Sequence, residues 1–259
     1  MRLVFLGTGT SFGIPQVGCR CAVCLSSDPH DRRTRVGAVV ESDGGTRLLL
    51  DTPPELRMQL VASAIDRVDA VLFTHAHADH THGIDDLRAL TCRDQSALPM
   101  YGSAETMDRL VERFGYIFDD EARPIPGTSK PEGRMVVLRE GETVMIGDLP
   151  VTPFAVPHGP VHVFAYRIGD LGYVTDAKEL NAQAYETLEG VRVLVLNALW
   201  RSPHPTHLSI SEAVDVAERI GATRTYLTHL THRTSHAELC AELPPHIQPA
   251  HDGLTVRVD

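Results

Sequence analysis

The sequence predicts an α/β protein in which mixed β-sheets pack in layers with helices on the outside. Three observations support this class: short apolar, β-branched runs recur along the chain, helical patterns lie between some of them, and other runs arrive as hairpin-like pairs. Some runs alternate with helices, and others follow one another directly. The presence of both kinds indicates sheets that contain parallel and antiparallel strands. Periodicity alone leaves the number of layers open.

The strands are predicted where an apolar run is bounded by charged or turn residues. These runs are VGAVVES, TRLLLD, VDAVLFT, RMVVLRE, VHVFAYRIG, LGYVT, VRVLVLN and TRTYLT. The clearest helix begins after Ser209, forms a capping box with Glu212 and ends at Gly221. Its predicted buried face consists of Ile210, Ala213, Val214, Ala217 and Ile220. Ser235 and Glu238 repeat the capping signal farther along.

One stretch interrupts this pattern. Residues 119–133, DDEARPIPGTSKPEG, contain three prolines and are predicted to form an exposed loop. Elsewhere we find no internal repeat, low-complexity tract or linker that would force a second domain. We therefore expect one domain over residues 1–259.

Composition narrows the class of ligand and the location. The 259 residues carry a formal charge of −10 and no Lys/Arg run, so small substrates are favoured over long nucleic acid. The N-terminus MRLVFLGTGTS reaches a glycine too soon for a signal-peptide core or a membrane span. We expect a cytoplasmic protein without a membrane association.

The five cysteines favour a metal site over a disulfide framework, because an odd number cannot all pair. Three of them form C-x-C-x-x-C in a loop at about 17–26: Cys19, Cys21 and Cys24. Three thiolates can surround a tetrahedral ion but need a fourth donor, for which His232 is the candidate. The alternative is three reduced cysteines without a ligand role. Cys92 and Cys240 are predicted to be inert buried thiols.

The segment HAHADH follows the predicted strand VDAVLFT. In an extended segment His75 and His77 would point to one side, and the following turn would present Asp79 and His80. Three imidazoles and a carboxylate within six residues are typical of a metal site that holds two ions.

Three later predicted strands also end in a residue that can bind metal. FAVP is followed by His158, LGYVT by Asp176 and TYLT by His229. Taken alone, each of these residues would more often have a structural role. Together they supply the donors that a two-metal site needs in addition to those of HAHADH. Strand ends are also where ligands distant in the sequence converge.

The HxHxDH motif at residues 75–80 and the later His158, Asp176 and His229 make the chain resemble the metallo-β-lactamase superfamily. The resemblance covers essentially the whole chain and implies a four-layer αββα sandwich. It further implies one ion held by His75, His77 and His158 and a second held by Asp79, His80 and His229, with Asp176 bridging them. The bridging carboxylate is similar to that of the phosphodiesterase and thioesterase branches.

Two further stretches resemble the cyclic phosphodiesterases of the carbon-phosphorus lyase pathway: GTGTSFGIPQVGCRCAVC and LTHLTH. In that group such cysteines and the second histidine hold a structural zinc, which implies a zinc site at Cys19, Cys21, Cys24 and His232. PTHLS places His207 at a helix start and resembles the histidine that contacts the scissile phosphate in the phosphodiesterase branch and the tRNA 3′-processing enzymes. His207 would donate a proton to the leaving oxygen or stabilise phosphoryl charge.

Other residues have weaker signals. Asp51 either orients a ligating histidine or serves a turn in DTPPE. Three histidines close to motif residues are open to contact with substrate or to structural roles: His82, His204 and His236. Asn197 stands where related sequences are expected often to carry an acidic residue, which leaves the surroundings of His207 undetermined.

These features together predict a metal-dependent hydrolase that cleaves a small cyclic or nucleotide-like phosphodiester, with a metal-bridging hydroxide positioned by Asp79 and Asp176. Two catalytic divalent ions are expected, zinc or manganese first and iron or nickel as alternatives, besides one structural zinc. Rival functions are a glyoxalase-II-like thioesterase, a tRNA 3′-processing nuclease and a catalytically silent metal or nucleotide sensor. The oligomeric state stays open, and a homodimer is compatible with the sequence.

Overall fold

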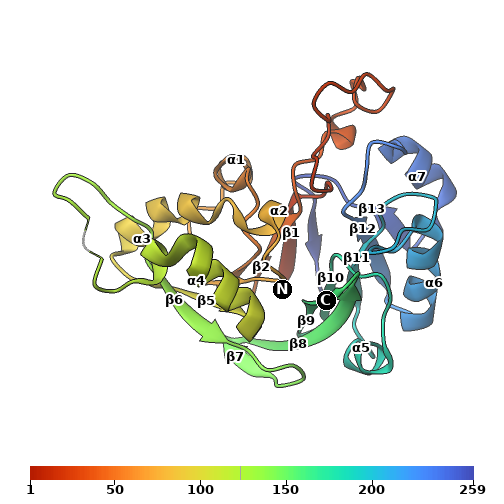
Figure 1. The fold of residues 1–259 in the computed structure, drawn as a ribbon. Helices are drawn as coiled ribbons and strands as arrows, with labels where there is room; N and C mark the ends of the chain where they lie inside the picture. Colours follow the sequence, from red (N-terminus) through yellow and green to blue (C-terminus); the bar gives the residue numbers. More distant parts are fainter. Residues whose placement is uncertain (123) are drawn as a thin grey trace.

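The structure is a computed structural model of the chain and describes residues 1–122 and 124–259. In this part of the chain two seven-stranded sheets face each other, and helices cover their outer faces (Figure 1). The arrangement is an αββα sandwich of four layers. It confirms the fold class that the resemblance implied.

The first sheet has the strand order β14, β1, β2, β3, β4, β5, β6. Its strands from β14 to β3 pair antiparallel, and those from β3 to β6 pair parallel. Their bounds are β1 (Arg2–Gly7), β2 (Gly37–Glu41), β3 (Arg47–Leu50), β4 (Ala70–Leu72), β5 (Leu98–Gly102), β6 (Gly133–Val137) and β14 (Thr255–Arg257).

The second sheet has the order β13, β12, β11, β10, β9, β8, β7. Here β13 to β10 pair parallel and β10 to β7 antiparallel, so this sheet is mixed as predicted. The bounds are β7 (Val144–Ile146), β8 (Leu149–His158), β9 (Val161–Ile168), β10 (Leu171–Val174), β11 (Val193–Asn197), β12 (Arg224–Thr228) and β13 (Ile247–Pro249).

Helices from the two halves of the chain cover the two sheets separately (Figure 1). The first half contributes α1 (Leu56–Ala62), α2 (Ala78–Thr81), α3 (Arg88–Asp94) and α4 (Ala104–Phe118), and the second half contributes α5 (Ala182–Thr187), α6 (Ile210–Ile220) and α7 (His236–Glu242). Two short 3-10 turns are η1 (Pro29–Asp31) and η2 (Ile84–Leu87). None of the helices in the described residues is long and apolar enough to cross a bilayer.

Side chains alternate along each strand between two cores. In β1, Leu3 and Phe5 point between the sheets, whereas Val4 and Leu6 point outward to the side covered by α1. The same alternation in β11 sends Val195 inward and Leu196 toward α6. Because a strand buried on both faces needs apolar residues at every position, the runs in the sequence are continuous and not alternating.

The predicted strands and the capped helix are confirmed, with α6 showing the capping box of Ser209 and Glu212 and a left-handed Gly221. The prediction missed most of β8, which contains Pro150, Pro153 and Pro157. Proline is tolerated there because β7 pairs with β8 only from Leu149 to Val151, which leaves the later prolines at the edge of the sheet.

The stretch 119–133 lies between α4 and β6 and is exposed at residues 124–129, although Pro131 is buried. Arg123, which belongs to the same predicted loop, lies outside the described residues. The prediction for Cys92 and Cys240 was wrong, since both are exposed. They lie on the solvent sides of the short helices α3 and α7, and a hydrophobicity pattern over seven residues is too short to show which side faces the core.

Candidate metal centre

Seven side chains predicted as ligands meet where strands of both sheets end. His75 and His77 follow β4, and Asp79 and His80 lie in the four-residue helix α2 that comes next. The other three stand at or just beyond the ends of β8, β10 and β12: His158, Asp176 and His229. These strands run in one direction in their sheet, so their final residues reach the same edge of the sandwich.

The ligand atoms form two groups, and within each group all atoms lie within 4.8 Å of one another. One group consists of His75, His77 and His158, and the other of Asp79, His80 and His229. Asp176 lies between the groups. One of its oxygens, Oδ1, is 3.4 Å from His80 Nε2, and the other, Oδ2, is 3.4 Å from His229 Nε2 and 3.9 Å from His158 Nε2. The structure therefore brings together the seven side chains in the arrangement expected of a two-metal site.

Three residues at this edge have left-handed backbone conformations that side chains rarely adopt. The φ angles are 61° at Asp51, 58° at Asp176 and 57° at His229, and each residue follows the end of a strand. A non-glycine residue held in this region costs about 1–3 kcal/mol, and such strain gathers at functional sites. The turn at each strand end aims the side chain into the shared space.

Neighbouring polar groups orient the histidine rings. The Nδ1 atom of His80 is 2.7 Å from Asp51 Oδ2, that of His75 is 2.9 Å from Thr74 Oγ1, and that of His158 is 3.0 Å from the carbonyl oxygen of Thr206. With Nδ1 occupied, each ring is left with Nε2 for the centre.

The charge state of these groups suits metal binding. Loss of hydration lowers the pKa values of His75, His77 and His158, so the rings are neutral near pH 7 and keep a lone pair for an ion. Although burial opposes it, the attraction of His229 and His80 holds the pKa of Asp176 well below its usual value. Burial alone would lower the pKa of His80, but the carboxylates of Asp176, Asp79 and Asp51 raise it well above normal. The carboxylates thus hold a proton on His80 that a bound cation would displace.

Orphaned ring nitrogens provide a further test of whether cations fit here. The Nε2 atoms of His80 and His229 are buried and have no hydrogen-bond partner among residues 1–122 and 124–259. Leaving such atoms unpaired costs about 1–3 kcal/mol each. Imidazole nitrogens and carboxylate oxygens are the donors that zinc, manganese, iron and nickel accept, so the residues present fit a pair of divalent ions.

His207 joins the centre although it belongs to neither group of ligands. It stands just before α6, with its Nε2 atom 3.1 Å from Asp176 Oδ2 and its Nδ1 atom 2.8 Å from Thr206 Oγ1. The neighbouring His204 approaches from behind, 3.3 Å away between the two Nδ1 atoms. Asn197 is fully buried and bonds both backbone groups of Ala177, so it supports the turn after Asp176 and leaves His207 untouched.

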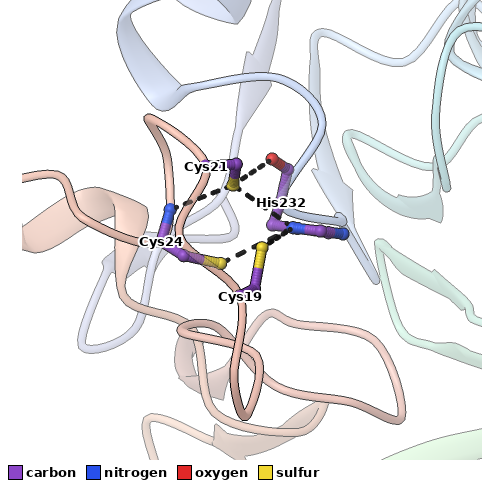
Figure 2. Close-up of side chains that lie close together, drawn as sticks. All are labelled: Cys19, Cys21, Cys24 and His232. Atoms are coloured by element: carbon purple, nitrogen blue, oxygen red, sulfur yellow. Dashed lines mark hydrogen bonds between the residues drawn. The ribbon is translucent and has the colours of Figure 1, made fainter.

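The cysteine loop forms a second cluster. The sulfur atoms of Cys19, Cys21 and Cys24 lie 3.3, 3.3 and 3.5 Å from His232 Nδ1 and point at one another (Figure 2). The backbone N–H of Cys24 and the contact with His232 lower the pKa of the Cys21 thiol to about 6 against the effect of burial. Three sulfurs and one ring nitrogen within 4.8 Å are a donor set suited to tetrahedral zinc.

Two of the open histidines lie away from the centre. His82 is exposed and packs edge-on against Phe114, at 5.8 Å between ring centroids. His236 stacks on His30, at 4.8 Å, beside His251.

Pockets border the candidate metal centre, and metal-ligating residues form part of their lining. The sequence did not predict the residues that form the rest of that lining. A pocket of about 240 Å³ is lined by His75 and His77 and by two arginines of α4, Arg109 and Arg113. The guanidinium of Arg113 donates to the carbonyl oxygen of Ala76, between the two histidines. The i, i+4 spacing of the arginines marks one helix face, but nothing in the sequence tells which site that face borders.

Comparisons with known proteins place the chain among metallo-hydrolases. A sequence profile described as the beta-lactamase superfamily domain matches residues 46–230. The crystal structure of a diphosphatase from the PhnP family is 38% identical, with a TM-score of 0.90 over 100% of this chain and 98% of that one. The zinc-bound PqqB structure from Methylobacterium extorquens has a TM-score of 0.81 over 99% of this chain and 100% of that one, at 19% identity, which shows the fold alone.

A curated relative, an octanoyltransferase of Porphyromonas gingivalis, is 38% identical over 100% of this chain and 52% of its own length. The chain spans about half the length of the curated relatives it matches. The name of that relative therefore describes a protein in which about half of the sequence lies outside the matched part.

Proposed function

The chain belongs to the metallo-β-lactamase superfamily and, within it, to the PhnP family, and from this premise we propose that it is a metal-dependent phosphohydrolase that cleaves a small phosphodiester. The substrate is a small cyclic or nucleotide-like molecule and not a long nucleic acid. This assignment rests on residues of the chain whose arrangement suits phosphoryl chemistry.

The contact between His207 and Asp176 carries the proposal. Ligand atoms of His158, Asp176 and His207 lie within 4.8 Å of one another. The ring of His207 also stacks on that of His229, at 4.7 Å between centroids, so His207 borders both groups of ligands. Two ions need only the seven other side chains. His207 is therefore free to act as a hydrogen-bond donor beside the centre. The transfer of a charged phosphoryl group requires such a donor, whereas a thioesterase of the glyoxalase II type would not need it.

Divalent ions bound here would polarise phosphoryl oxygens and lower the pKa of water. The protein's own part is to hold its donors in place. Asp79 and Asp176 stay ionised because neighbouring histidines hold their pKa values below the usual range despite burial. Both carboxylates can therefore hold cations and orient a water molecule by accepting its hydrogen bonds.

His207 would act as a donor to the substrate. Burial lowers its pKa, so the ring is neutral near pH 7 and carries a single N–H. Since Nε2 faces Asp176, that hydrogen lies on the side of the centre. From there it can be shared with a phosphoryl oxygen or with the leaving oxygen as negative charge develops.

A diphosphate ester is the second candidate substrate. The 38% identical PhnP-family structure is that of a diphosphatase. In this chain Arg109 and Arg113 border the pocket that His75 and His77 open into. Glu105 is the one acidic side chain among the described lining residues, and it pairs with Arg109 at 3.2 Å. A guanidinium pair next to the metal centre suits the second, unreacting phosphate of such a substrate.

The test is a substrate panel with the metal-loaded protein: bis(p-nitrophenyl) phosphate, diadenosine diphosphate and S-lactoylglutathione. Hydrolysis of either phosphate compound without thioester cleavage supports the proposal, and the ratio between the two phosphates selects the substrate class. Thioester cleavage alone would make the protein a glyoxalase-II-like enzyme. Salt-sensitive binding of tRNA would revive the nuclease, and failure of all three substrates would favour a silent sensor.

A further inference from the structure

A second pocket borders the candidate metal centre and shares none of its described lining residues with the pocket of the α4 arginines. It has a volume of about 270 Å³, and His207 and His229 form part of its lining. The remaining walls come from three separate segments, residues 10–16, 199–204 and 231–233. A substituent of a phosphate held at the centre would therefore extend into it.

The walls of this pocket are flat and aromatic. The ring of Phe12 is 65% exposed, which is unusual for a large apolar side chain unless something covers it. Elsewhere in the lining, the guanidinium carbon of Arg233 lies 4.1 Å from the centre of the Trp200 ring, and His204 meets the same ring edge-on, at 5.0 Å between ring centroids. Aromatic rings and guanidinium planes are the surfaces on which nucleic-acid bases stack.

The polarity of the lining suits a neutral ring with hydrogen-bonding edges. None of the described residues that line the pocket is acidic, although the chain as a whole carries a charge of −10. Gln16 contributes an amide that can both donate and accept, which matches the edge of a base. Among the described lining residues a second phosphate would find Arg233 as the one fixed charge, whereas the pocket beside α4 offers two arginines.

The cysteine cluster holds two of these walls together. Thr10 donates its backbone N–H to the carbonyl oxygen of Leu230, at 3.2 Å, and Leu230 donates to that of Thr8, at 3.0 Å. A few residues farther on, the two segments meet again where the cysteines surround His232 (Figure 2). Phe12 and Arg233 thus stand on segments fixed at both places, which reduces the entropy lost when a ligand binds.

We propose that this pocket binds the nucleobase of the substrate, so that the enzyme acts on a nucleoside phosphodiester or diphosphate. The inference rests on the proposed function for the phosphate, but binding of the base depends only on Phe12, Trp200 and Arg233. The two can therefore be tested separately.

Trp200 reports on the pocket directly, because it is the one tryptophan in the sequence. Its fluorescence, excited at a wavelength where adenine does not absorb, is titrated with adenosine, AMP and ribose 5-phosphate. Adenosine and AMP should quench it in a saturable way, and ribose 5-phosphate, which lacks the base, should not. Phe12→Leu and Arg233→Gln should each weaken the affinity for AMP about five- to tenfold, or about 1–1.4 kcal/mol, since each removes one of the surfaces on which the base stacks.

Arg201→Gln is the matched control. Arg201 follows Trp200 in the chain but pairs with Glu242, at 2.6 and 2.8 Å, and does not line the pocket. It should leave the affinity for AMP unchanged, and circular dichroism shows that each variant is folded. Equal affinity for AMP and ribose 5-phosphate, or unchanged AMP affinity in both pocket variants, would overturn the base site. If adenosine binds but no phosphate compound is hydrolysed, the base site stands and the proposed hydrolase does not.

Discussion

Asp51 Oδ2 lies 2.7 Å from His80 Nδ1, and neither side chain is exposed to solvent. The same carboxylate accepts hydrogen bonds from the backbone and hydroxyl of Thr74, at 2.8 and 2.9 Å, and that hydroxyl touches His75 Nδ1. One aspartate therefore orients a histidine from each of the two ligand groups. Such outer partners fix the tautomer of a ligand and raise its basicity.

Asp51→Asn should weaken metal binding about 10- to 100-fold, because the amide cannot accept from both His80 and Thr74 as the carboxylate does. Competition with a chromophoric chelator measures the affinity. Asp108→Asn, an exposed change on α4, is the control. Equal affinities in the two variants would mean that Asp51 serves only the turn after β3.

His207→Ala should lower kcat for bis(p-nitrophenyl) phosphate about 100- to 1,000-fold, since it removes a donor aimed at developing charge. Metal content should not change, because the ring is outside both ligand groups. His246→Ala, at the opposite end of β12 from His229, should have little effect on either quantity. Loss of metal together with activity would instead make His207 a ligand.

Cys21→Ala should release one equivalent of zinc and lower the melting temperature, since structural zinc contributes directly to folding. Metal analysis and a thermal melt of the same sample measure both changes. Cys92→Ala provides the comparison, because Cys92 is exposed and outside the cluster. A Cys21 variant that keeps the zinc content of the wild type would rule out the site.

His236 predicts a pH dependence of stability. Burial, with Arg33 nearby, lowers its pKa from 6.5 to about 4. The unfolded chain therefore takes up a proton below about pH 6.5 that the folded protein excludes until about pH 4, so this contribution to stability is present above pH 6.5 and is lost as the pH falls through that interval. The melting temperature of His236→Gln should decline less steeply between these limits than that of the wild type. Parallel curves would contradict the assignment.

The sequence predicted what depends on local pattern. Continuous apolar runs identified the buried strands, and Ser209 with Glu212 identified the start of α6, because both signals lie within a few residues. HAHADH indicated metal for the same reason. The exposure of Cys92 and Cys240 was mispredicted, because the side of a short helix that faces solvent depends on its neighbours in space.

Contacts between residues that are distant in the sequence could be identified only from the structure. The pairing of Asp51 with His80 joins residues 29 apart, and Phe12 and Arg233 come from opposite ends of the chain to one pocket. Left-handed backbone at Asp51, Asp176 and His229 is equally hidden, since Asp and His adopt it more often than most residues but still only in a small fraction of cases. The resemblance to a known family supplied the grouping of ligands that spacing alone could not.

The most direct test of the central claim is metal analysis and a bis(p-nitrophenyl) phosphate assay on one purified sample, before and after chelation and after addition of zinc or manganese. We expect about three ions per chain, two at the histidine and aspartate groups and one at the cysteines. Chelation should abolish hydrolysis as the two catalytic ions leave, and added metal should restore it. Undiminished hydrolysis by the metal-free protein would show that the reaction does not depend on bound metal.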